Sequence, residues 1–202
     1  MTDSTEFFDQ HLGQSRTMVI MRGYSPDETV RYCEQALAAG AGLVEVPVQS
    51  PEALSSLFAA IEWGRRVGVP VGAGTVIDVE MFETVREAGA LFTVAPGLDE
   101  DVVAASLRAG VPHLPGVATA SEVQRAQKLR YVWMKAFPAA SLGADWITAM
   151  HGPFPRARFV VTGGVSVDNA ASFLNAGASA VSLGASFASA SVEAVRGLAK
   201  SA

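Results

Sequence analysis

A lysine inside an apolar run is the first residue that could carry chemistry. Lys135 lies within residues 130–140, RYVWMKAFPAA, among Val, Trp, Met, Phe and Pro. The other two lysines, Lys128 and Lys200, lie in polar or terminal surroundings. Burial lowers the pKa of a lysine, because desolvation disfavours the charged ammonium. The sequence therefore indicates an amine that is free to attack a carbonyl carbon and form an imine.

Glu45 interrupts a second apolar run, LVEVPV at residues 43–48. An unpaired buried charge costs several kcal/mol, or its pKa shifts until the group is neutral. A carboxylate near Lys135 would oppose the lowering of the lysine pKa, and it could move protons during imine formation and enamine protonation. A buried ion pair with no catalytic role is the alternative interpretation, because structural pairs also perturb pKa values.

Both residues belong to a regular alternation of short apolar runs and segments with helical periodicity. The runs are spaced by roughly 18–27 residues, which predicts strands that are each followed by one helix. The predicted strands are residues 17–22, 43–48, 70–76, 91–96, 113–118, 131–136, 158–163 and 180–185. Ser25, Ser50, Asp78 and Thr119 are predicted to cap helix starts, and glycines to end several helices.

Eight β–α units without a linker or a break in composition predict a closed parallel α/β barrel of the TIM (β/α)8 type. The first thirteen residues, MTDSTEFFDQHLG, predict a short amphipathic helix before it. An open doubly wound sheet would need a point where the strand order reverses, and no feature marks one. The length of 202 residues fits a single domain, residues 1–202.

In such a barrel the carboxyl ends of the strands form the catalytic face. Polar or turn-forming residues gather at these ends, whereas the strands are otherwise almost wholly apolar. They are Arg22, Glu45, Gln49, Thr75, Pro96, Lys135, residues 162–164 (TGG) and residues 184–186 (GAS). Glycine turns after the last two strands expose backbone amides, which favours a phosphorylated ligand there, although a Gly-Gly pair can also be only a tight turn.

Within VGAGTV, residues 71–76, small residues permit close approach of the backbone to a ligand. We interpret Gly72 and Ala73 as packing residues that relieve crowding inside the barrel. Thr75, which closes the strand, offers its hydroxyl to a ligand.

The composition argues against several other functions. The net charge is −5 and there is no basic run, so nucleic acid is not an expected partner. Cys33 is the only cysteine, which excludes an intrachain disulfide and a cysteine metal cluster. His11, His113 and His151 occupy unrelated positions, so we expect no metal and no cofactor.

Membrane attachment is not expected either. No apolar run reaches the roughly 20 residues of a membrane span. The acidic, amphipathic N-terminal segment does not have the pattern of a signal peptide. The cytoplasm is therefore the expected compartment.

The motifs together resemble those of the 2-keto-3-deoxy-6-phosphogluconate (KDPG) and 4-hydroxy-2-oxoglutarate (KHG) aldolases. These are metal-independent barrels that act through an imine. The resemblance extends over nearly the whole chain, in family order and spacing. It is carried by VIMRG, VEVPVQS, VGAGTV, VAPG, LPGVATASE, KAFPAA, TGGVS and LGASF.

The resemblance implies a role for each motif residue. Lys135 would form the imine with a pyruvate-type carbonyl, Glu45 would be the general acid and base, and Thr75 would contact the pyruvyl end. Thr162 would bind substrate, and Pro96 and Phe137 would line the pocket. The phosphate-binding residues would be Gly163, Gly164, Gly184, Ala185 and Ser186.

The implied reaction cleaves a phosphorylated keto-deoxy sugar acid to pyruvate and glyceraldehyde 3-phosphate. The implied assembly is a homotrimer. A 4-hydroxy-2-oxoglutarate aldolase, a phosphate-binding barrel isomerase and a non-catalytic sugar-phosphate binder are the alternatives.

Gln49 departs from the pattern of many phosphogluconate-cleaving members, which have an arginine at this position. A neutral amide should bind a substrate carboxylate more weakly than a guanidinium does. Arg22, at the end of the first strand, could supply the missing charge. The segments around these residues are closer to the branch that cleaves 2-keto-3-deoxy-6-phosphogalactonate, so the sugar epimer stays open.

Overall fold

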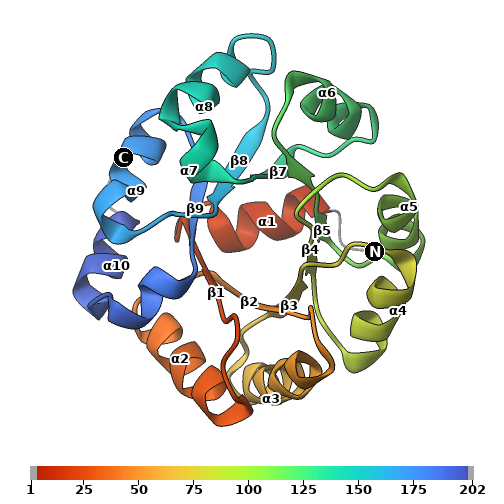
Figure 1. Cartoon of the computed structure of the whole chain (residues 1–202), viewed down its shortest axis with the longest axis vertical. Helices are drawn as coiled ribbons and strands as arrows, with labels where there is room; N and C mark the ends of the chain where they lie inside the picture. Colours follow the sequence, from red (N-terminus) through yellow and green to blue (C-terminus); the bar gives the residue numbers. More distant parts are fainter. Residues whose placement is uncertain (1–3, 200–202) are drawn as a thin grey trace.

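The strands of the computed structural model, which describes residues 4–199, form one parallel sheet that curls into a barrel (Figure 1). The order of the strands in the sheet is β5-β4-β3-β2-β1-β9-β8-β7-β6, and neighbouring strands pair in parallel. The strands are β1 (Thr17–Ile20), β2 (Leu43–Pro47), β3 (Val71–Gly74), β4 (Thr93–Val94), β5 (His113–Leu114), β6 (Gly116–Val117), β7 (Trp133–Ala136), β8 (Arg158–Thr162) and β9 (Ala180–Leu183).

The strand predicted at residues 113–118 is divided into β5 and β6 at Pro115. Proline has no N–H group to donate to the ladder, so the regular pairing stops at this residue. Its carbonyl oxygen still accepts a hydrogen bond from the Lys135 backbone N–H at 2.8 Å. Because β5 pairs with β4 and β6 pairs with β7, the chain between them joins the two ends of the sheet. The predicted TIM-type barrel is therefore confirmed, with one strand interrupted.

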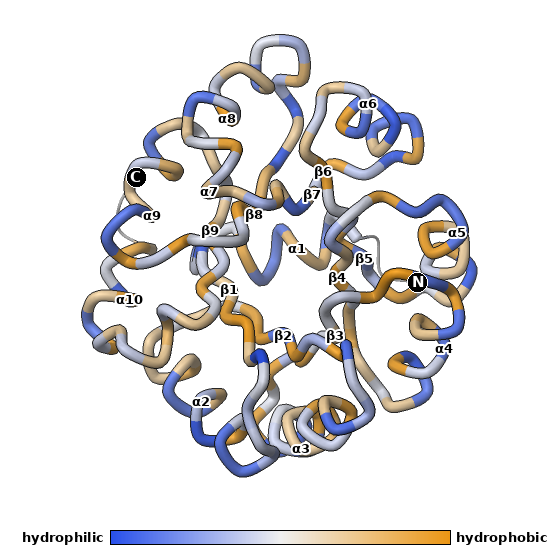
Figure 2. Tube along the Cα trace, viewed as in Figure 1, coloured by the Kyte–Doolittle hydropathy of each residue, from blue (hydrophilic) through white to orange (hydrophobic). Residues whose placement is uncertain are grey.

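Helices surround the barrel, and Figure 2 shows hydrophilic residues on the outer turns of α2 and α5. The α-helices are α1 (Ser4–Leu12), α2 (Pro26–Ala38), α3 (Pro51–Val67), α4 (Val79–Ala88), α5 (Glu100–Ala109), α6 (Ala120–Lys128), α7 (Ala139–Leu142), α8 (Ala144–His151), α9 (Val167–Asn175) and α10 (Val192–Leu198). A 3-10 helix, η1 (Ala185–Ser189), follows β9.

The predicted helix starts are confirmed. Ser25 and Thr119 each form a complete capping box, and the Asp78 side chain accepts a hydrogen bond from the Met81 N–H at 2.7 Å. Ser50 precedes α3 without a side-chain capping bond within the described residues. There Pro51, whose fixed φ suits the first helical turn, sets the start instead.

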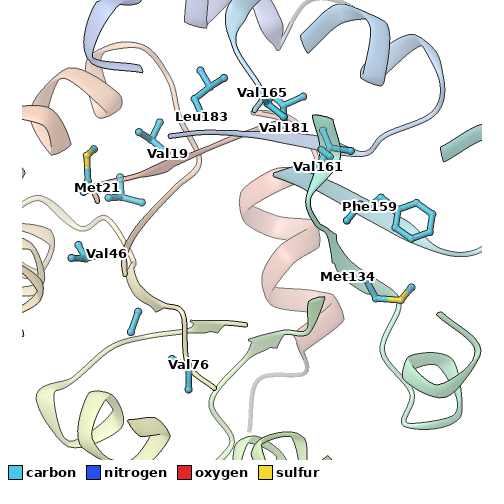
Figure 3. Packing of buried hydrophobic residues seen from close by; sticks show 14 of the residues in the cluster. Val19, Met21, Val46, Val76, Met134, Phe159, Val161, Val165, Val181 and Leu183 are labelled. Atoms are coloured by element: carbon cyan, nitrogen blue, oxygen red, sulfur yellow. The ribbon is translucent and has the colours of Figure 1, made fainter. Parts of the chain in front are cut away.

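Two apolar clusters hold the barrel together. The larger lies between the sheet and the helices, and Figure 3 shows several of its side chains, such as Val19, Val161 and Val181, on the outer side of the strands. The smaller fills the barrel interior beneath the site. Its members are Phe7, Phe8, Leu12, Met18, Leu43, Phe92, Val94, Leu114, Trp133, Val160 and Ala180.

Helix α1 lies across the end of the barrel where the strands begin (Figure 1). The Phe8 ring packs against Phe92 and Trp133, at centroid distances of 6.0 and 6.2 Å. Trp133 Nε1 donates to Asp9 Oδ1 at 2.7 Å, and Arg158 forms an ion pair with the same carboxylate. The predicted N-terminal helix is thus confirmed over Ser4–Leu12, while residues 1–3 of that prediction lie outside the described residues. Because α1 covers the amino end of the barrel, the site must lie at the other end.

His113 is a fully buried histidine on β5, outside the site. Its Nδ1 shares a hydrogen bond with the Thr93 hydroxyl at 2.8 Å, and its Nε2 has no hydrogen-bond partner among residues 4–199. Burial lowers the pKa of His113 from 6.5 to about 4. The folded protein therefore holds this imidazole in its neutral form.

The neutral His113 should make the folded state less stable in acid. The unfolded chain binds the proton at a pKa of 6.5, whereas the folded chain resists it until about 4. This contribution to stability is complete above the higher value and is lost as the pH falls toward the lower one. Thermal unfolding across this range should show a shallower loss of Tm in His113→Gln than in the natural protein. Equal slopes in the two proteins would contradict the expectation.

Candidate active site

A pocket of about 620 Å³ opens at the carboxyl end of the barrel. It is formed by the ends of β1, β7, β8 and β9 and by the loops that follow these four strands. Most of the predicted site residues line it together. They are Arg22, Lys135, Phe137, Thr162, Gly163, Gly164, Gly184, Ala185 and Ser186.

Lys135 projects from β7 into this pocket and is only 3% exposed. Its Nζ lies 5.1 Å from the centroid of the Phe137 ring, so the amine faces an aromatic surface. Burial lowers the pKa of Lys135, the negative charge of Glu45 raises it, and the positive charge of Arg22 lowers it. Desolvation is the largest of these effects, so the net result is a lowered pKa, and the uncharged amine is more accessible here than in water.

Glu45 lies on β2 and is fully buried. Neither carboxyl oxygen has a hydrogen-bond partner within the described part of the chain. Burial raises the pKa of Glu45, while the charges of Lys135 and Arg22 lower it. The ion pairs formed among residues 4–199 do not include Lys135 with Glu45. The two groups therefore influence each other's protonation without a closed salt bridge.

Arg22, Gln49 and Thr75 meet at one side of the barrel mouth. The Arg22 guanidinium donates hydrogen bonds to Gln49 Oε1 and, at 3.4 Å, to Thr75 Oγ1. Thr75 has a φ of 62°, a left-handed conformation that residues other than glycine rarely adopt. Such conformations cluster at ligand-binding sites, where the surrounding structure maintains them. The three residues form one polar group with its positive charge held in place.

The turn after β8 is fixed by hydrogen bonds of its own. Gly163 and Gly164 have φ values of 94° and 73°, which only glycine adopts without strain. The Gly163 carbonyl accepts from the Ala140 N–H, and the Gly164 carbonyl accepts from Asn169 Nδ2, both at 2.9 Å. The Ser186 hydroxyl donates to the Val165 carbonyl at 2.8 Å and ties the neighbouring loop to this turn. The two glycine turns thus form one end of the pocket, beside the start of α9.

Some predicted residues do not line the pocket. Glu45 is not among the lining residues, although its charge acts on Lys135. Thr75 accepts a hydrogen bond from the lining residue Arg22, and Gln49 borders a separate groove near the start of α3. Pro96 lies against Gly116, where an added Cβ would come within 2.2 Å of its carbonyl group. A role of Pro96 in shaping the pocket stays a prediction.

Four lining residues were not predicted from the sequence. They are Ile20, Val165, Ser166 and Ser182. Ser166 caps α9 and is recognisable from its spacing to Asn169, which completes a capping box. Ser182 faces inward on β9, and strand alternation from Ala180 could have indicated this.

Comparison with known proteins identifies the family. The family model for KDPG and KHG aldolases matches residues 8–199. The chain belongs to the KDPG and KHG aldolase family. The resemblance drawn from the motifs is confirmed.

Curated members of the family include both sugar-acid types. A 2-dehydro-3-deoxy-phosphogluconate aldolase of Pseudomonas aeruginosa is 42% identical over 142 residues. These residues are 69% of this chain but 63% of that protein, less than two thirds of its length. A 2-dehydro-3-deoxy-6-phosphogalactonate aldolase of Escherichia coli is 31% identical over 170 residues, which cover 83% of this chain and 82% of that one.

A solved structure of the family shows the same fold. KDPG aldolase from Legionella pneumophila, with pyruvate captured as a covalent carbinolamine, matches with a TM-score of 0.82 at 26% identity. The match covers 98% of this chain and 97% of that one.

Within residues 4–199 no helix is long and apolar enough to cross a membrane. No three His, Cys, Asp or Glu side chains of this part of the chain come together as metal ligands would.

The charges around Lys135 should move its titration in opposite directions. Glu45→Gln removes the charge that raises the lysine pKa, so the free amine should appear at lower pH. Arg22→Gln removes a charge that lowers the lysine pKa, so the amine should appear at higher pH. Labelling with acetic anhydride across a pH series, read by mass spectrometry of the Lys135 peptide, measures both shifts. Exposed Lys128 serves as the internal reference. Shifts of the Lys135 titration in the same direction in both variants would contradict the opposing effects of Glu45 and Arg22.

Proposed function

We propose that this protein is a class I aldolase that cleaves a 2-keto-3-deoxy-6-phospho sugar acid to pyruvate and glyceraldehyde 3-phosphate. The observation that carries the proposal is the buried Lys135 amine, with its lowered pKa, in one pocket with two glycine turns. Membership of the KDPG and KHG aldolase family supports the reaction. The named relatives support the class of substrate.

The reaction follows from the two buried groups. The Lys135 amine attacks C2 of the substrate, and loss of water gives a protonated imine. Glu45, directly or through a water molecule, takes the proton of the C4 hydroxyl as the C3–C4 bond breaks and its electrons move toward the imine nitrogen. Glyceraldehyde 3-phosphate leaves and the enamine of pyruvate remains. Glu45 returns a proton to C3, and hydrolysis of the imine releases pyruvate and the lysine.

The remaining residues bind and orient the substrate. In the proposed complex the substrate carboxylate lies near Arg22, which donates hydrogen bonds to Gln49 and Thr75. Thr75 contacts the pyruvyl end, and Thr162, which lines the pocket, also binds substrate. The phosphate lies in the turns of Gly163–Gly164 and Gly184–Ser186, with Phe137 and Pro96 shaping the pocket. Backbone amides of glycine turns suit phosphate, so this end of the pocket favours phosphorylated acids over 4-hydroxy-2-oxoglutarate.

The protonated imine is the electron sink, so the proposed mechanism requires no metal and no organic cofactor.

We further propose one domain over residues 1–202, a homotrimer and a cytoplasmic location, with neither nucleic acid nor membrane as partner. Large apolar side chains on the surface, such as Phe58 at 49% exposure and Leu91 at 56%, are suitable for contacts between subunits.

Substrate choice is tested by one assay. Pyruvate release should be measured side by side with the gluconate-derived phosphate, the galactonate-derived phosphate and 4-hydroxy-2-oxoglutarate. One of the phosphorylated acids should be the best substrate. Release from the unphosphorylated acid at an equal kcat/KM would contradict the assignment of the glycine turns to phosphate.

Lys135→Arg should abolish turnover, because a guanidinium stays protonated and cannot attack a carbonyl carbon. In the natural protein, borohydride with pyruvate should add covalent mass to the peptide that contains Lys135. Lys128→Arg, at the exposed lysine, should retain both activity and trapping. An isomerase or a non-catalytic binder would gain no mass, and measurable turnover by Lys135→Arg would refute the nucleophile.

Arg22→Ala should raise KM by about 10- to 100-fold, the equivalent of losing one charged hydrogen bond of ~1.5–3 kcal/mol. The value of kcat should change less, since the imine chemistry is retained. Steady-state kinetics with the best phosphorylated acid measure the effect. Arg156→Ala, at an exposed arginine outside the pocket, is the matched control. An unchanged KM would assign carboxylate binding to Gln49 instead.

A further inference from the structure

Strand β3 presents two glycines to the barrel interior. Val71 and Ala73 belong to the apolar cluster between the sheet and the helices, so their side chains point outward. Side chains alternate along a strand, and Gly72 and Gly74 therefore face inward. The two positions have the same orientation but adjoin different layers of the interior.

The space beside each glycine is occupied by a different group. A Cβ added to Gly72 would lie 2.4 Å from a carbon of the Phe92 ring, within the apolar cluster beneath the site. A Cβ added to Gly74 would lie 1.4 Å from Glu45 Oε2. The next nearest atoms are the other two atoms of the same carboxyl group, at 2.5 and 2.9 Å. The space that a side chain of residue 74 would fill therefore holds the Glu45 carboxyl.

The strand register shows which way this carboxyl leans. Glu45 pairs with Gly72 across the two strands, and Pro47 pairs with Gly74. The Glu45 side chain thus reaches one inward position further along β3 than its own Cα. This direction leads toward the carboxyl ends of the strands, where the pocket and Lys135 lie.

Space, and not backbone conformation, is what position 74 requires. Gly74 is not one of the glycines with a positive φ, so an L-residue can adopt its backbone conformation. Its carbonyl accepts the Val48 N–H at 3.0 Å, a bond that alanine would also make. A methyl group at this position would conflict with the Glu45 carboxyl alone among the nearest atoms.

We propose that Gly74 is a positioning residue for catalysis: its missing side chain leaves the space in which the Glu45 carboxyl lies and fixes the direction in which that group transfers protons. The inference rests on the proposed function, because it gives Glu45 the role of acid and base. Displacing a reacting group by about 1 Å can cost 10²-fold in rate, so a methyl group there is a sensitive probe.

Pyruvate alone isolates the step that Glu45 performs. The Lys135 amine condenses with C2 of pyruvate and releases water. Glu45 then takes a proton from the methyl group, and the electron pair of that C–H bond forms the enamine. In D₂O the return step delivers deuterium to the methyl carbon. Methyl exchange, followed by NMR, therefore reports proton transfer, whereas borohydride trapping reports imine formation at Lys135.

Gly74→Ala should slow methyl exchange by about 10²-fold when the rate is expressed per site trapped by borohydride. Trapping itself should persist, because Lys135 is not displaced. Gly72→Ala is the matched control on the same face of the same strand. It should lower Tm through its conflict with Phe92, yet exchange per trapped site should stay near that of the natural protein.

A double-mutant cycle shows whether the methyl group acts through the carboxyl. Aspartate at position 45 is one methylene shorter and leaves room beside residue 74. Gly74→Ala should therefore slow exchange much less in the Glu45→Asp background than in the natural background. A purely structural effect of the methyl group would be equal in both.

Three results would overturn the inference: natural exchange in Gly74→Ala, a parallel loss of trapping and exchange, or equal effects in both backgrounds. The proposed function fails in a different way. If the natural protein neither traps pyruvate nor exchanges its methyl protons, the aldolase assignment itself is wrong. If the natural protein does both and Gly74→Ala exchanges normally, only the role of Gly74 is wrong.

Discussion

The free energy of holding an amine and a carboxyl inside an apolar barrel is the constraint on which the site depends. Lys135 is 3% exposed and Glu45 is 0% exposed. The ion pairs within the described residues do not include one between these two groups. Burial favours the neutral form of each, whereas their mutual attraction favours the charged forms. In both groups burial is the larger effect: it lowers the pKa of the Lys135 amine, as a nucleophile requires, and raises the pKa of the Glu45 carboxyl, as a group that takes and returns protons requires.

The rest of the barrel keeps these two groups buried by separating an apolar layer from a reactive one. Helix α1, with Phe8 against Trp133, covers the end where the strands begin, so the pocket beside Lys135 opens at the opposite end. Along β3 the same division recurs within two residues. The bare face of Gly72 accommodates the Phe92 ring below, and the bare face of Gly74 accommodates the Glu45 carboxyl above. The lack of a side chain at Gly72 and Gly74 is thus as important to the site as the reactive groups.

The sequence was sufficient to place Lys135 and Glu45 together, because carboxyl ends of parallel strands meet at one end of a barrel and both residues interrupt apolar runs. Capping patterns at Ser25 and Thr119 located helix starts, because a capping box is formed by residues only three positions apart. The break of one strand at Pro115 was missed, although a residue without an N–H group indicates it. Ser166 and Ser182 were missed as pocket residues. Capping spacing marks Ser166 as the start of α9, and strand alternation marks Ser182 as inward-facing, but neither pattern shows that the loops after β8 and β9 enclose one pocket with them.

The departure at Gln49 is explained by its neighbour. Gln49 Oε1 accepts a hydrogen bond from the Arg22 guanidinium, so an arginine at position 49 would place two positive charges where one is now held by a neutral acceptor. Arg22 also lowers the pKa of both Lys135 and Glu45. A substrate carboxylate beside Arg22 would offset that charge and raise both pKa values. In the proposed mechanism, substrate binding then makes Glu45 a stronger proton acceptor as the C3–C4 bond breaks, so the residue that binds the substrate also prepares the residue that transfers the proton.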